Sequence, residues 1–555
     1  MNTQELAKIL KASHVGEPLS FFGFSIDSRA IKGGEVFIAL RGKVHDGHNF
    51  AQEAIKKGAV AVLCERLLDL PKNVPQILVE DSLMALRNIA LWKRENFKGK
   101  VVAIAGSAGK TTTKEMTAFL LSKVRKVCKT PRNYNSQVGV PLSVANFEED
   151  CAFWVVELGA SQKGDVKRLV EIVKPHVRAI TAIGEEHLET FGCLDDVILG
   201  NGEIFYGMEE KDWGVCPAKV SHCYAIPKKL TFGDEDFSAE EIKLSAEGVS
   251  FKVKGKEVFI PIPSLAVVEN ALCAFRILEA LGVDWREISN SLTDFHPVEG
   301  RFRVIKKKDL ILIDDTYNAN PPSVRMALKS LSLFDGYRIA VLGDMLELGE
   351  LSEAYHREIG RLCTELGIDL CLFYGDHMKY AYQECLQKGG NCTFFEDKKR
   401  LLDFLLGKSF GKAVILFKGS RGMKMEELVE FEEVRYGMLM MVLCDRWGRV
   451  YDVWISFGSV HEVRAFRERK RRSLWFRKLV ENCVVYGDRG YRGCEGVIVC
   501  DSREMRAKRQ VVEGVISQIK LFNAGSGWRT LTCVHVYTYA YAIGYSYYRR
   551  GELEA

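Results

Sequence analysis

The sequence lacks the features that mark several classes of protein. Its 16 cysteines include no C-x-x-C pair, which argues against zinc ribbons and thioredoxin-like redox motifs. There is no internal repeat and no low-complexity linker. Residues 1–10 lack the long apolar core of a secretory signal and instead have the spacing of a short amphipathic helix. We therefore expect a cytoplasmic, multidomain globular chain whose cysteines are reduced core residues.

The charge is unevenly distributed along the 555 residues. The chain carries a formal net charge of +5, yet residues 431–555 hold 21 Lys and Arg against 14 Asp and Glu. All of the basic excess therefore lies in this tail, which also prefers Arg to Lys by 17 to 4. Such a change in composition indicates a separate origin or partner for the tail.

One uncharged stretch, Leu531–Tyr548, has the length of a membrane span. It contains His535, Thr538 and Ser546 together with several tyrosines, so its mean apolarity is poor for a hydrocarbon environment. We therefore expect a buried or misfolded tail segment here rather than a membrane helix.

The order of apolar runs predicts an α/β fold built from several units. Buried-strand patterns alternate with helical segments, for example at Val101–Ala105 and Leu310–Ile313, and this alternation is typical of mostly parallel sheets. We place a small α/β domain at residues 1–97, a central domain at 98–295, a third α/β domain at 296–430 and a separate α/β tail fragment at 431–555.

A glycine-rich turn follows the strand at Val101–Ala105 and opens a helix, as in phosphate-binding loops. Backbone N–H groups at such a turn point at a bound anion, while a lysine neutralises charge between phosphates and a hydroxyl can ligate Mg²⁺. A strict motif would place glycine at position 104, where this chain has Ile104. The shorter loop still predicts a nucleotide site made of Gly106, Ser107, Ala108, Gly109, Lys110, Thr111 and Thr112.

Two further side chains follow neighbouring strands. Glu157 ends the apolar run Phe153–Val156, and His187 follows the run Ala179–Ile183. The carboxyl ends of strands in α/β sheets are where ligands bind, and a carboxylate with an imidazole suits a divalent cation that bridges phosphates. We therefore predict a metal site formed by Thr111, Glu157 and His187.

The segment Asp314–Ser323, with sequence DDTYNANPPS, is the most specific signal in the chain. It follows a predicted strand, and Pro321 and Pro322 suit the first turn of a helix starting near Ser323. Its amides and phenol are placed to hydrogen-bond a peptide backbone.

Taken in order over residues 1 to about 430, these motifs resemble the Mur ligase family. The resemblance implies three domains, namely a UDP-sugar-binding domain, a central P-loop ATPase domain and a Rossmann-like domain. It also implies ATP and Mg²⁺ as cofactors, and formation of an amide bond through an acyl phosphate. The acid that receives the phosphate and the nucleotide are both anions, so cations beside the transferring phosphate would matter most.

The resemblance assigns roles to individual residues. Residues with expected catalytic roles are Lys110, Glu157, His187, Arg301 and Asp315. ATP is expected to contact the phosphate loop together with Asn270, Arg301 and Asp315. Residues with expected substrate contacts are Ser28, Arg29 and His48 in the first domain, Asn133 and Asn135 in the second, and Tyr317, Asn318 and Asn320 in the third.

Two positions depart from the family pattern. Where the family has a carbamylated lysine that helps to hold a second metal, this chain has Asn201. A neutral amide cannot replace an anionic carbamate, so we expect no carbamate dependence. The stretch Ser264–Asn270 keeps only the last asparagine of the family motif, which puts the contacts to adenine in question.

The segment at 314–323 resembles the branch of the family that adds a dipeptide, because the relatives that add single amino acids carry a His-Pro version. The expected substrates are UDP-N-acetylmuramoyl tripeptide and D-alanyl-D-alanine, giving the pentapeptide precursor of peptidoglycan, and we expect a monomer. Two alternatives remain open: a sister ligase that adds one amino acid, and an inactive ligase fusion. The third residue of the tripeptide, diaminopimelate or lysine, is not determined.

The tail resembles a different family. Tyr486–Tyr491 and Arg509–Glu513 look like the later half of an insertion-sequence transposase, with Asp488 and Glu513 as two of its three acids. The first acid would lie upstream, where ligase sequence stands instead, and two-metal chemistry needs it. We expect a remnant without strand-transfer activity whose positive charge gives at most weak, salt-sensitive DNA binding.

Overall fold

The computed structural model describes residues 1–42, 44–307, 310–408, 410–429, 438–444, 450–457, 485–487 and 497–499. Two compact units make up the chain: Met1–Leu401 with Phe410–Glu426, and Leu402–Ser409 with Glu427–Ala555. In the second unit, β21 (Met438–Cys444) pairs antiparallel with β22 (Val450–Phe457), and β23 (Val485–Gly487) pairs parallel with β24 (Val497–Val499). The predicted transposase acids Asp488 and Glu513 and the stretch 531–548 lie outside the described residues.

The first unit begins with a helix and a small sheet. Helix α1 (Thr3–Leu10) starts at a capping box in which the Asn2 side chain accepts from the Glu5 backbone and the Glu5 side chain accepts from the Asn2 backbone. The amphipathic helix expected at residues 1–10 is thus confirmed. The sheet has the order β1-β5-β4-β3-β2. Its strands are β1 (Ser13–Val15), β2 (Gly23–Ser25), β3 (Glu35–Ile38), β4 (Ala61–Cys64) and β5 (Gln76–Leu78), with α2 at Ala51–Lys56 and α3 at Ser82–Asn96.

The second sheet is parallel throughout and has the order β11-β10-β9-β6-β8-β7. Strand β6 lies near the middle, and five of its six residues are buried, as parallel strands covered on both faces require. The strands are β6 (Lys100–Ala105), β7 (Val127–Lys129), β8 (Phe153–Glu157), β9 (Val177–Ile180), β10 (Trp213–Pro217) and β11 (Lys228–Phe232). The helices are α4 (Lys110–Ser122), α5 (Gly139–Ala145), α6 (Asp165–Val173), α7 (Leu188–Phe191), α8 (Leu194–Gly202), α9 (Leu265–Ala280) and α10 (Trp285–Ile288).

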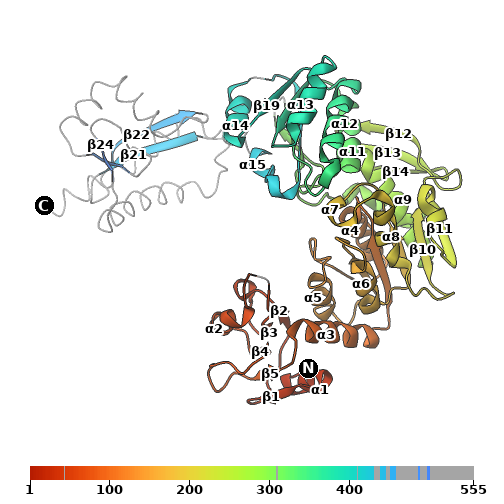
Figure 1. The fold of residues 1–555 in the computed structure, drawn as a ribbon, viewed down its shortest axis with the longest axis vertical. Helices are drawn as coiled ribbons and strands as arrows, with labels where there is room; N and C mark the ends of the chain where they lie inside the picture. Colours follow the sequence, from red (N-terminus) through yellow and green to blue (C-terminus); the bar gives the residue numbers. More distant parts are fainter. Residues whose placement is uncertain are drawn as a thin grey trace. The chain divides into compact units, whose positions relative to one another are not determined.

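A three-stranded antiparallel sheet follows, which was not among the predicted elements. It consists of β12 (Glu240–Ser245), β13 (Gly248–Val253) and β14 (Lys256–Ile260) and is drawn in green in Figure 1. Strand β12 is mostly exposed, so its sequence carries no long apolar run.

The third sheet has the order β15-β16-β20-β17-β18-β19, and only its edge strand β15 runs antiparallel. Helix α11 has proline at its first two positions, and Asn320 caps it, which confirms the predicted helix start. The strands are β15 (Arg303–Lys307), β16 (Leu310–Asp315), β17 (Tyr337–Gly343), β18 (Leu370–Tyr374), β19 (Cys392–Phe395) and β20 (Ala413–Lys418). The helices are α11 (Pro321–Ser332), α12 (Ser352–Glu365), α13 (Met378–Gln387), α14 (Lys398–Gly407) and α15 (Glu426–Val429).

The predicted α/β class with mostly parallel sheets is therefore confirmed (Figure 1). One cluster of buried hydrophobic side chains includes residues of both the second and third sheets, such as Ile104 and Ile313. The four residue ranges proposed for the domains stay a prediction.

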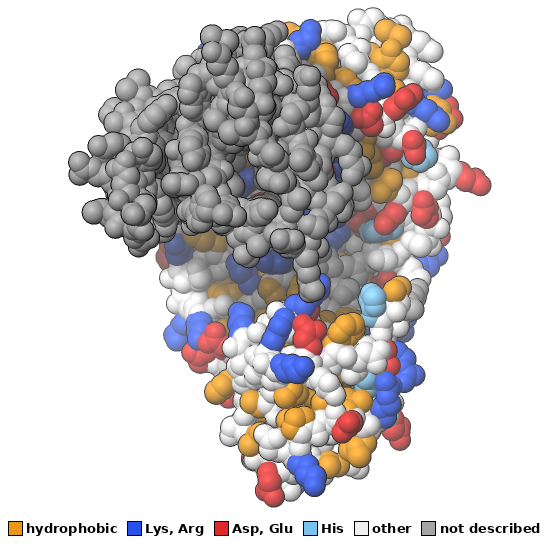
Figure 2. Space-filling view, turned by 90° about the vertical axis from the view of Figure 1, so that its left-hand side faces the viewer, with side chains coloured by type: hydrophobic (Ala, Val, Ile, Leu, Met, Phe, Trp, Pro, Cys, Tyr) orange, Lys and Arg blue, Asp and Glu red, His pale blue; other side chains and the backbone are white. Residues whose placement is uncertain are grey.

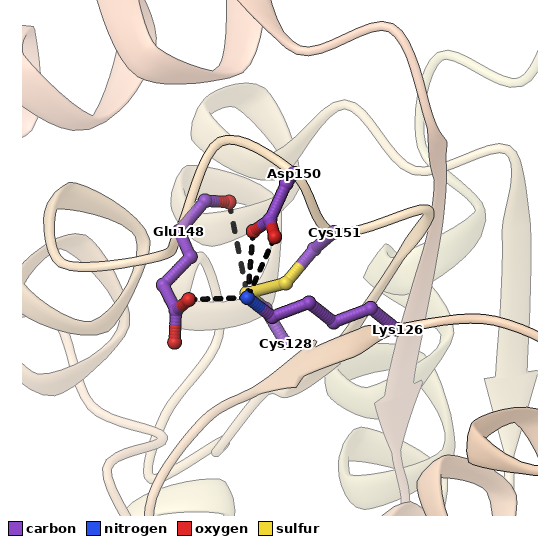
Figure 3. The surroundings of a disulfide bond; sticks show 5 residues. All are labelled: Lys126, Cys128, Glu148, Asp150 and Cys151. Carbon is purple, nitrogen blue, oxygen red and sulfur yellow. Dashed lines mark hydrogen bonds and ion pairs between the residues drawn. A yellow bond between two sulfur atoms is a disulfide. The ribbon is translucent and has the colours of Figure 1, made fainter.

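The expectation that all cysteines are reduced is wrong for one pair. Cys128 in β7 and Cys151, just before β8, form a disulfide with a Cα–Cα distance of 5.8 Å (Figure 3). Sheet pairing brings the two residues together, because β7 and β8 are neighbours in which Cys128 lies opposite Trp154, and Cys151 comes just before β8. Cys193 and Cys223 are exposed and so are not core residues, whereas the free cysteines at 64, 216, 273, 363, 371 and 385 are buried as expected.

The described part that is visible in Figure 2 has a mixed surface. Figure 2 shows acidic and basic side chains interspersed, with hydrophobic side chains in small groups between them. Within the described residues, no helix combines the length and apolarity that crossing a membrane requires.

Candidate active site

The predicted phosphate loop joins β6 to α4. Gly106 and Gly109 have φ angles of 132° and 82°, a region that side chains disfavour. A Cβ on Gly106 would lie 2.4 Å from Thr181 Oγ1, and one on Gly109 would lie 2.2 Å from Asn270 Oδ1. Both positions therefore require glycine, and the predicted nucleotide residue Asn270 lies directly against the loop. The backbone N–H groups at the start of α4 form the anion-binding end of the helix.

Lys110, the first residue of α4, has its amine at the centre of the loop. The amine donates a short hydrogen bond to Gly106 O, and it pairs with Glu186 Oε2 at 3.3 Å. Glu186 is 6% exposed. The loop lysine is therefore held by a buried carboxylate that the sequence analysis did not single out.

Asn201 completes this arrangement. Its Oδ1 accepts from the Gly106 N–H at 2.9 Å, and its Nδ2 donates to Glu186 Oε1 at 3.1 Å. The side chain is fully buried and donates also to Val197 O at 3.1 Å. Asn201 thus ties helix α8 to the phosphate loop and to the carboxylate that holds Lys110.

Glu157 lies at the carboxyl end of β8 and is 1% exposed. Its Oε1 accepts from Thr111 Oγ1 at 3.2 Å and from Asn135 Nδ2 at 2.9 Å. Its Oε2 is buried without a hydrogen bond, and its nearest cation is Lys114 Nζ at 3.6 Å. The predicted residues Thr111, Glu157 and Asn135 are therefore in contact, and one oxygen of the Glu157 carboxylate makes no hydrogen bond.

Lys114, one turn into α4, is fully buried. Its amine donates to Thr130 O at 2.8 Å and to Arg132 O at 2.6 Å. A buried ammonium needs such partners. It fixes the backbone of the segment that carries Asn133 and Asn135.

His187 precedes α7 in a left-handed conformation with φ 47°. Its Nδ1 forms a short hydrogen bond with Glu347 Oε2, and the Glu189 N–H donates to Glu347 O at 3.3 Å. Glu347 is also left-handed, with φ 64°. Two unfavourable backbone conformations at one contact are typical of functional sites, and the Nε2 atom stays available for a ligand.

No group of three or more His, Cys, Asp or Glu side chains arranged to hold a metal ion occurs in the described part of the chain. Oε2 of Glu157, which makes no hydrogen bond, and the Thr111 hydroxyl nevertheless suit a hard cation, because both are oxygen ligands. No described contact joins His187 to them.

Arg301, two residues before β15, contacts the phosphate loop. Arg301 Nη2 lies 3.4 Å from Thr111 Oγ1, and its guanidinium carbon lies 3.9 Å from the centre of the Tyr317 ring. Tyr317 is hydrogen-bonded to the Asn133 side chain, and burial raises the pKa of its phenol. A cation–aromatic pair thus connects the two segments expected to contact ATP and peptide.

Asp315, at the end of β16, has two partners. Its Oδ2 pairs with Lys418 Nζ at 2.6 Å, and its Oδ1 accepts from the Phe302 N–H at 3.2 Å. Lys418 is 2% exposed. Asp315, which is expected to contact ATP, is therefore oriented by a buried lysine from the neighbouring strand β20.

The amides of the 314–323 segment are well anchored. Asn320 caps α11 by accepting from Ser323 N, and its Nδ2 donates to Ser107 O in the phosphate loop at 3.2 Å. Asn318 accepts from the Arg421 N–H at 3.3 Å through its side chain. This segment therefore touches the loop that would hold the nucleotide.

The three residues predicted for the first domain differ in accessibility. Arg29 is largely exposed and pairs with Asp27 at 2.9 Å. Ser28 is buried and donates to Glu53. His48 is buried, with Nδ1 on Asp46 at 2.5 Å and Nε2 accepting from Glu65 N at 2.9 Å. Both ring nitrogens of His48 are thus used within the protein.

Models of known families match most of this region. The "Mur ligase middle domain" matches residues 104–278, the "Mur ligase, glutamate ligase domain" matches 300–421, and the "Mur ligase family, catalytic domain" matches 21–94. The UDP-N-acetylmuramoyl-tripeptide–D-alanyl-D-alanine ligase of Haemophilus influenzae is 33% identical over 451 residues, covering 77% of this chain and 97% of its own length. The chain belongs to the Mur ligase family. The Escherichia coli ligase of the same name is 32% identical, over 77% of this chain and 96% of its length.

Solved structures agree with this membership. A crystal structure of MurF from Acinetobacter baumannii has a TM-score of 0.70 and 30% identity, covering 77% of this chain and 98% of that one. The MurF ligase from Thermotoga maritima in complex with ADP has a TM-score of 0.65 and 29% identity, covering 74% and 97%. The three-domain Mur ligase fold expected from the sequence is therefore confirmed.

Proposed function

We propose that this Mur ligase uses ATP to join D-alanyl-D-alanine to UDP-N-acetylmuramoyl tripeptide, giving a pentapeptide. The observation that carries the proposal is the hydrogen bond from Asn320 to Ser107 O, because it sets the dipeptide-type segment against the phosphate loop. The named relatives from Haemophilus influenzae and Escherichia coli support the same substrates.

The chemistry is activation of a carboxylate. The terminal carboxylate of the tripeptide attacks the γ-phosphorus of ATP, ADP leaves, and the resulting acyl phosphate is attacked by the dipeptide amine with release of phosphate. Two anions must approach each other in the first step, so positive charge at the transferring phosphate lowers the barrier. Lys110, at the start of α4, and Arg301, just before β15, supply this charge.

Lys110 must exchange partners when ATP binds. Its amine is held by Gly106 O and Glu186, and the phosphates offer stronger, charged acceptors at the same place. Before ATP binds, the ion pair with Glu186 keeps the Lys110 amine close to the loop. Mg²⁺ would be held by Thr111 and Oε2 of Glu157, with Nε2 of His187 as a further candidate, and would neutralise the phosphates.

Other parts of the substrates would bind further out. Asp315, oriented by Lys418, is proposed to hold the ribose of ATP, and Asn270 lies on the nucleotide side of the loop. In the first domain, the exposed Arg29 could contact the UDP-sugar directly. His48 is buried and would act indirectly, by fixing the position of the Asp46 side chain to which it is hydrogen-bonded.

The decisive experiment measures phosphate release by the full-length chain. We expect release from ATP only when both UDP-N-acetylmuramoyl tripeptide and D-alanyl-D-alanine are present. Dependence on a single amino acid would instead indicate a sister ligase. Comparing the rates with tripeptides that end in diaminopimelate and in lysine identifies the third residue of the natural tripeptide substrate.

Two variants test the roles of the loop and of the tail. Lys110→Ala should lower kcat by about 100- to 1000-fold, the usual effect of removing one group that stabilises transition-state charge. Lys123→Ala, at the other end of α4, is the matched control and should leave kcat unchanged. Deletion of residues 436–555 should leave ligation intact; loss of ligation would show that the tail takes part.

A further inference from the structure

The segment 184–187, between β9 and α7, lies against the phosphate loop. Its first residue, Gly184, donates its N–H to Ser107 Oγ at 3.1 Å. Two residues later, Glu186 pairs with Lys110 at 3.3 Å. The position of this segment therefore helps to set where the loop lysine lies.

Helix α11 contacts the same segment through a salt bridge. The two carboxylate oxygens of Glu185 accept from Arg325 Nη1 at 3.0 Å and from Arg325 Nη2 at 3.3 Å. A Cβ on Gly184 would lie only 2.8 Å from Pro322 Cγ, in the first turn of this helix. The segment is thus packed closely against α11, and Arg325 supplies the charged contact.

Arg325 is itself held by a second carboxylate. Its Nε donates to Glu358 Oε1 at 2.6 Å, and its Nη2 donates to Glu358 Oε2 at 2.8 Å. The guanidinium carbon also lies 5.9 Å from the centre of the Tyr355 ring. Because a guanidinium is planar and binds each carboxylate through two hydrogen bonds, its position is fixed by α11 and α12 together.

Glu185 and Glu186 are consecutive carboxylates on one short stretch of backbone. Removal of Arg325 would take away the ion pair of Glu185 and leave a hydrogen bond to the neutral Tyr355 hydroxyl. The side chain of Glu185 is 14% exposed, and a largely buried carboxylate without a cation is costly, so it would turn toward water. The backbone that it shares with Glu186 would move with it, and the ion pair with Lys110 would lose its geometry.

We propose that Arg325 is a positioning residue for nucleotide binding, which holds the segment 184–187 and, through Glu186, places Lys110 for the phosphates. This inference rests on the proposed binding of ATP at the phosphate loop. The affinity for nucleotide then depends on a helix of the third sheet as well as on the loop itself.

The test is a calorimetric titration of the full-length protein with a non-hydrolysable ATP analogue and Mg²⁺. Arg325→Met removes the charge at similar length and should raise the Kd roughly 10-fold, within the usual range for coupling between separate sites. Arg325→Lys keeps the charge but cannot bind both carboxylates through paired hydrogen bonds, so it should raise the Kd less.

Arg357→Met is the matched control. Arg357 also pairs with two carboxylates, Glu353 at 2.8 Å and Glu384 at 3.9 Å, and it also lies near a tyrosine ring, that of Tyr380. These partners belong to α12 and α13 rather than to the segment 184–187. The control should therefore leave the Kd unchanged.

A second background separates positioning from a general structural role. In a Glu186→Gln protein the link from the segment to Lys110 is already broken, so adding Arg325→Met should change the Kd by less than about two-fold, whereas independent sites would multiply their effects. If Arg325→Met is too unstable in urea to be titrated, Arg325→Lys in the two backgrounds gives the same comparison.

An equal rise in Kd in both backgrounds overturns the inference, as does an Arg325→Met protein that binds the analogue as tightly as the unmodified protein. The proposed function fails separately: an unmodified protein that binds the analogue but does not ligate the two substrates refutes the ligase reaction and leaves the role of Arg325 in nucleotide binding intact.

Discussion

Replacing Asn201 by alanine tests whether this buried amide organises the phosphate loop. The side chain accepts from the Gly106 N–H at 2.9 Å and donates to Glu186 Oε1 at 3.1 Å. Alanine keeps only the Cβ atom and offers neither the acceptor for the Gly106 N–H nor the donor for Glu186. Because Asn201 and Glu186 are 0% and 6% exposed, water cannot readily replace the lost partners.

The magnitude follows from the two groups left without partners. An unsatisfied buried group costs about 1–3 kcal/mol, with charged groups at the upper end. The Gly106 N–H and one Glu186 oxygen together give an expected loss of about 2–6 kcal/mol in the free energy of unfolding. Without Asn201, the Gly106 N–H and the Glu186 carboxylate are no longer fixed in position, so the phosphate loop is less well organised and affinity for nucleotide should fall as well.

Urea denaturation measures the loss of stability, and calorimetric titration with a non-hydrolysable ATP analogue measures the affinity. Asn96→Ala is the control, because Asn96 is exposed and makes one hydrogen bond to Trp92 O; its effect should stay within about 0.5 kcal/mol. If Asn201→Ala unfolds at the same urea concentration as the control and binds nucleotide normally, the organising role is refuted.

Three further outcomes are expected. Reduction of the Cys128–Cys151 disulfide, which closes a separation of 23 residues, should lower the free energy of unfolding by about 3 kcal/mol; a Cys151→Ser variant should show the same loss and no response to reductant. Burial is the main reason why the pKa of His176 is lowered to about 4. Between pH 6.5 and 4 the imidazole is therefore protonated in the unfolded chain but not in the folded chain. The free energy of unfolding should fall as the pH drops through this range. His176→Asn, which can keep an acceptor for the Val101 N–H, should flatten that part of a pH series of denaturation curves. Added bicarbonate should not change the ligation rate, whereas a rise in rate that vanished in an Asn201 variant would contradict the expectation drawn from its neutral amide.

The buried parallel strands could be predicted from sequence because burial on both faces leaves continuous apolar runs. Val101–Ala105 and Leu310–Ile313 are such runs, and both became strands. Strand β12 gave no such signal, because most of its side chains face solvent. The disulfide was missed because its two cysteines come together only through the pairing of β7 with β8.

The site was predictable where function requires a local pattern, and not where it depends on long-range contacts. The glycines at 106 and 109 are demanded by the turn itself. Glu186, however, meets Lys110 across 76 positions, and Glu347 meets His187 across 160. A single sequence carries no local trace of such pairs, so both carboxylates were found only in the folded chain.

The contact between Arg301 and Thr111 has a consequence for how the proposed reaction is assembled. Of the two cations proposed to promote phosphoryl transfer, Lys110 belongs to the helix that follows the phosphate loop, whereas Arg301 lies 190 positions after Thr111. Because Arg301 contacts Thr111 directly, a change in the packing of its segment would alter the charge proposed to surround the transferring phosphate even if the loop itself stayed intact.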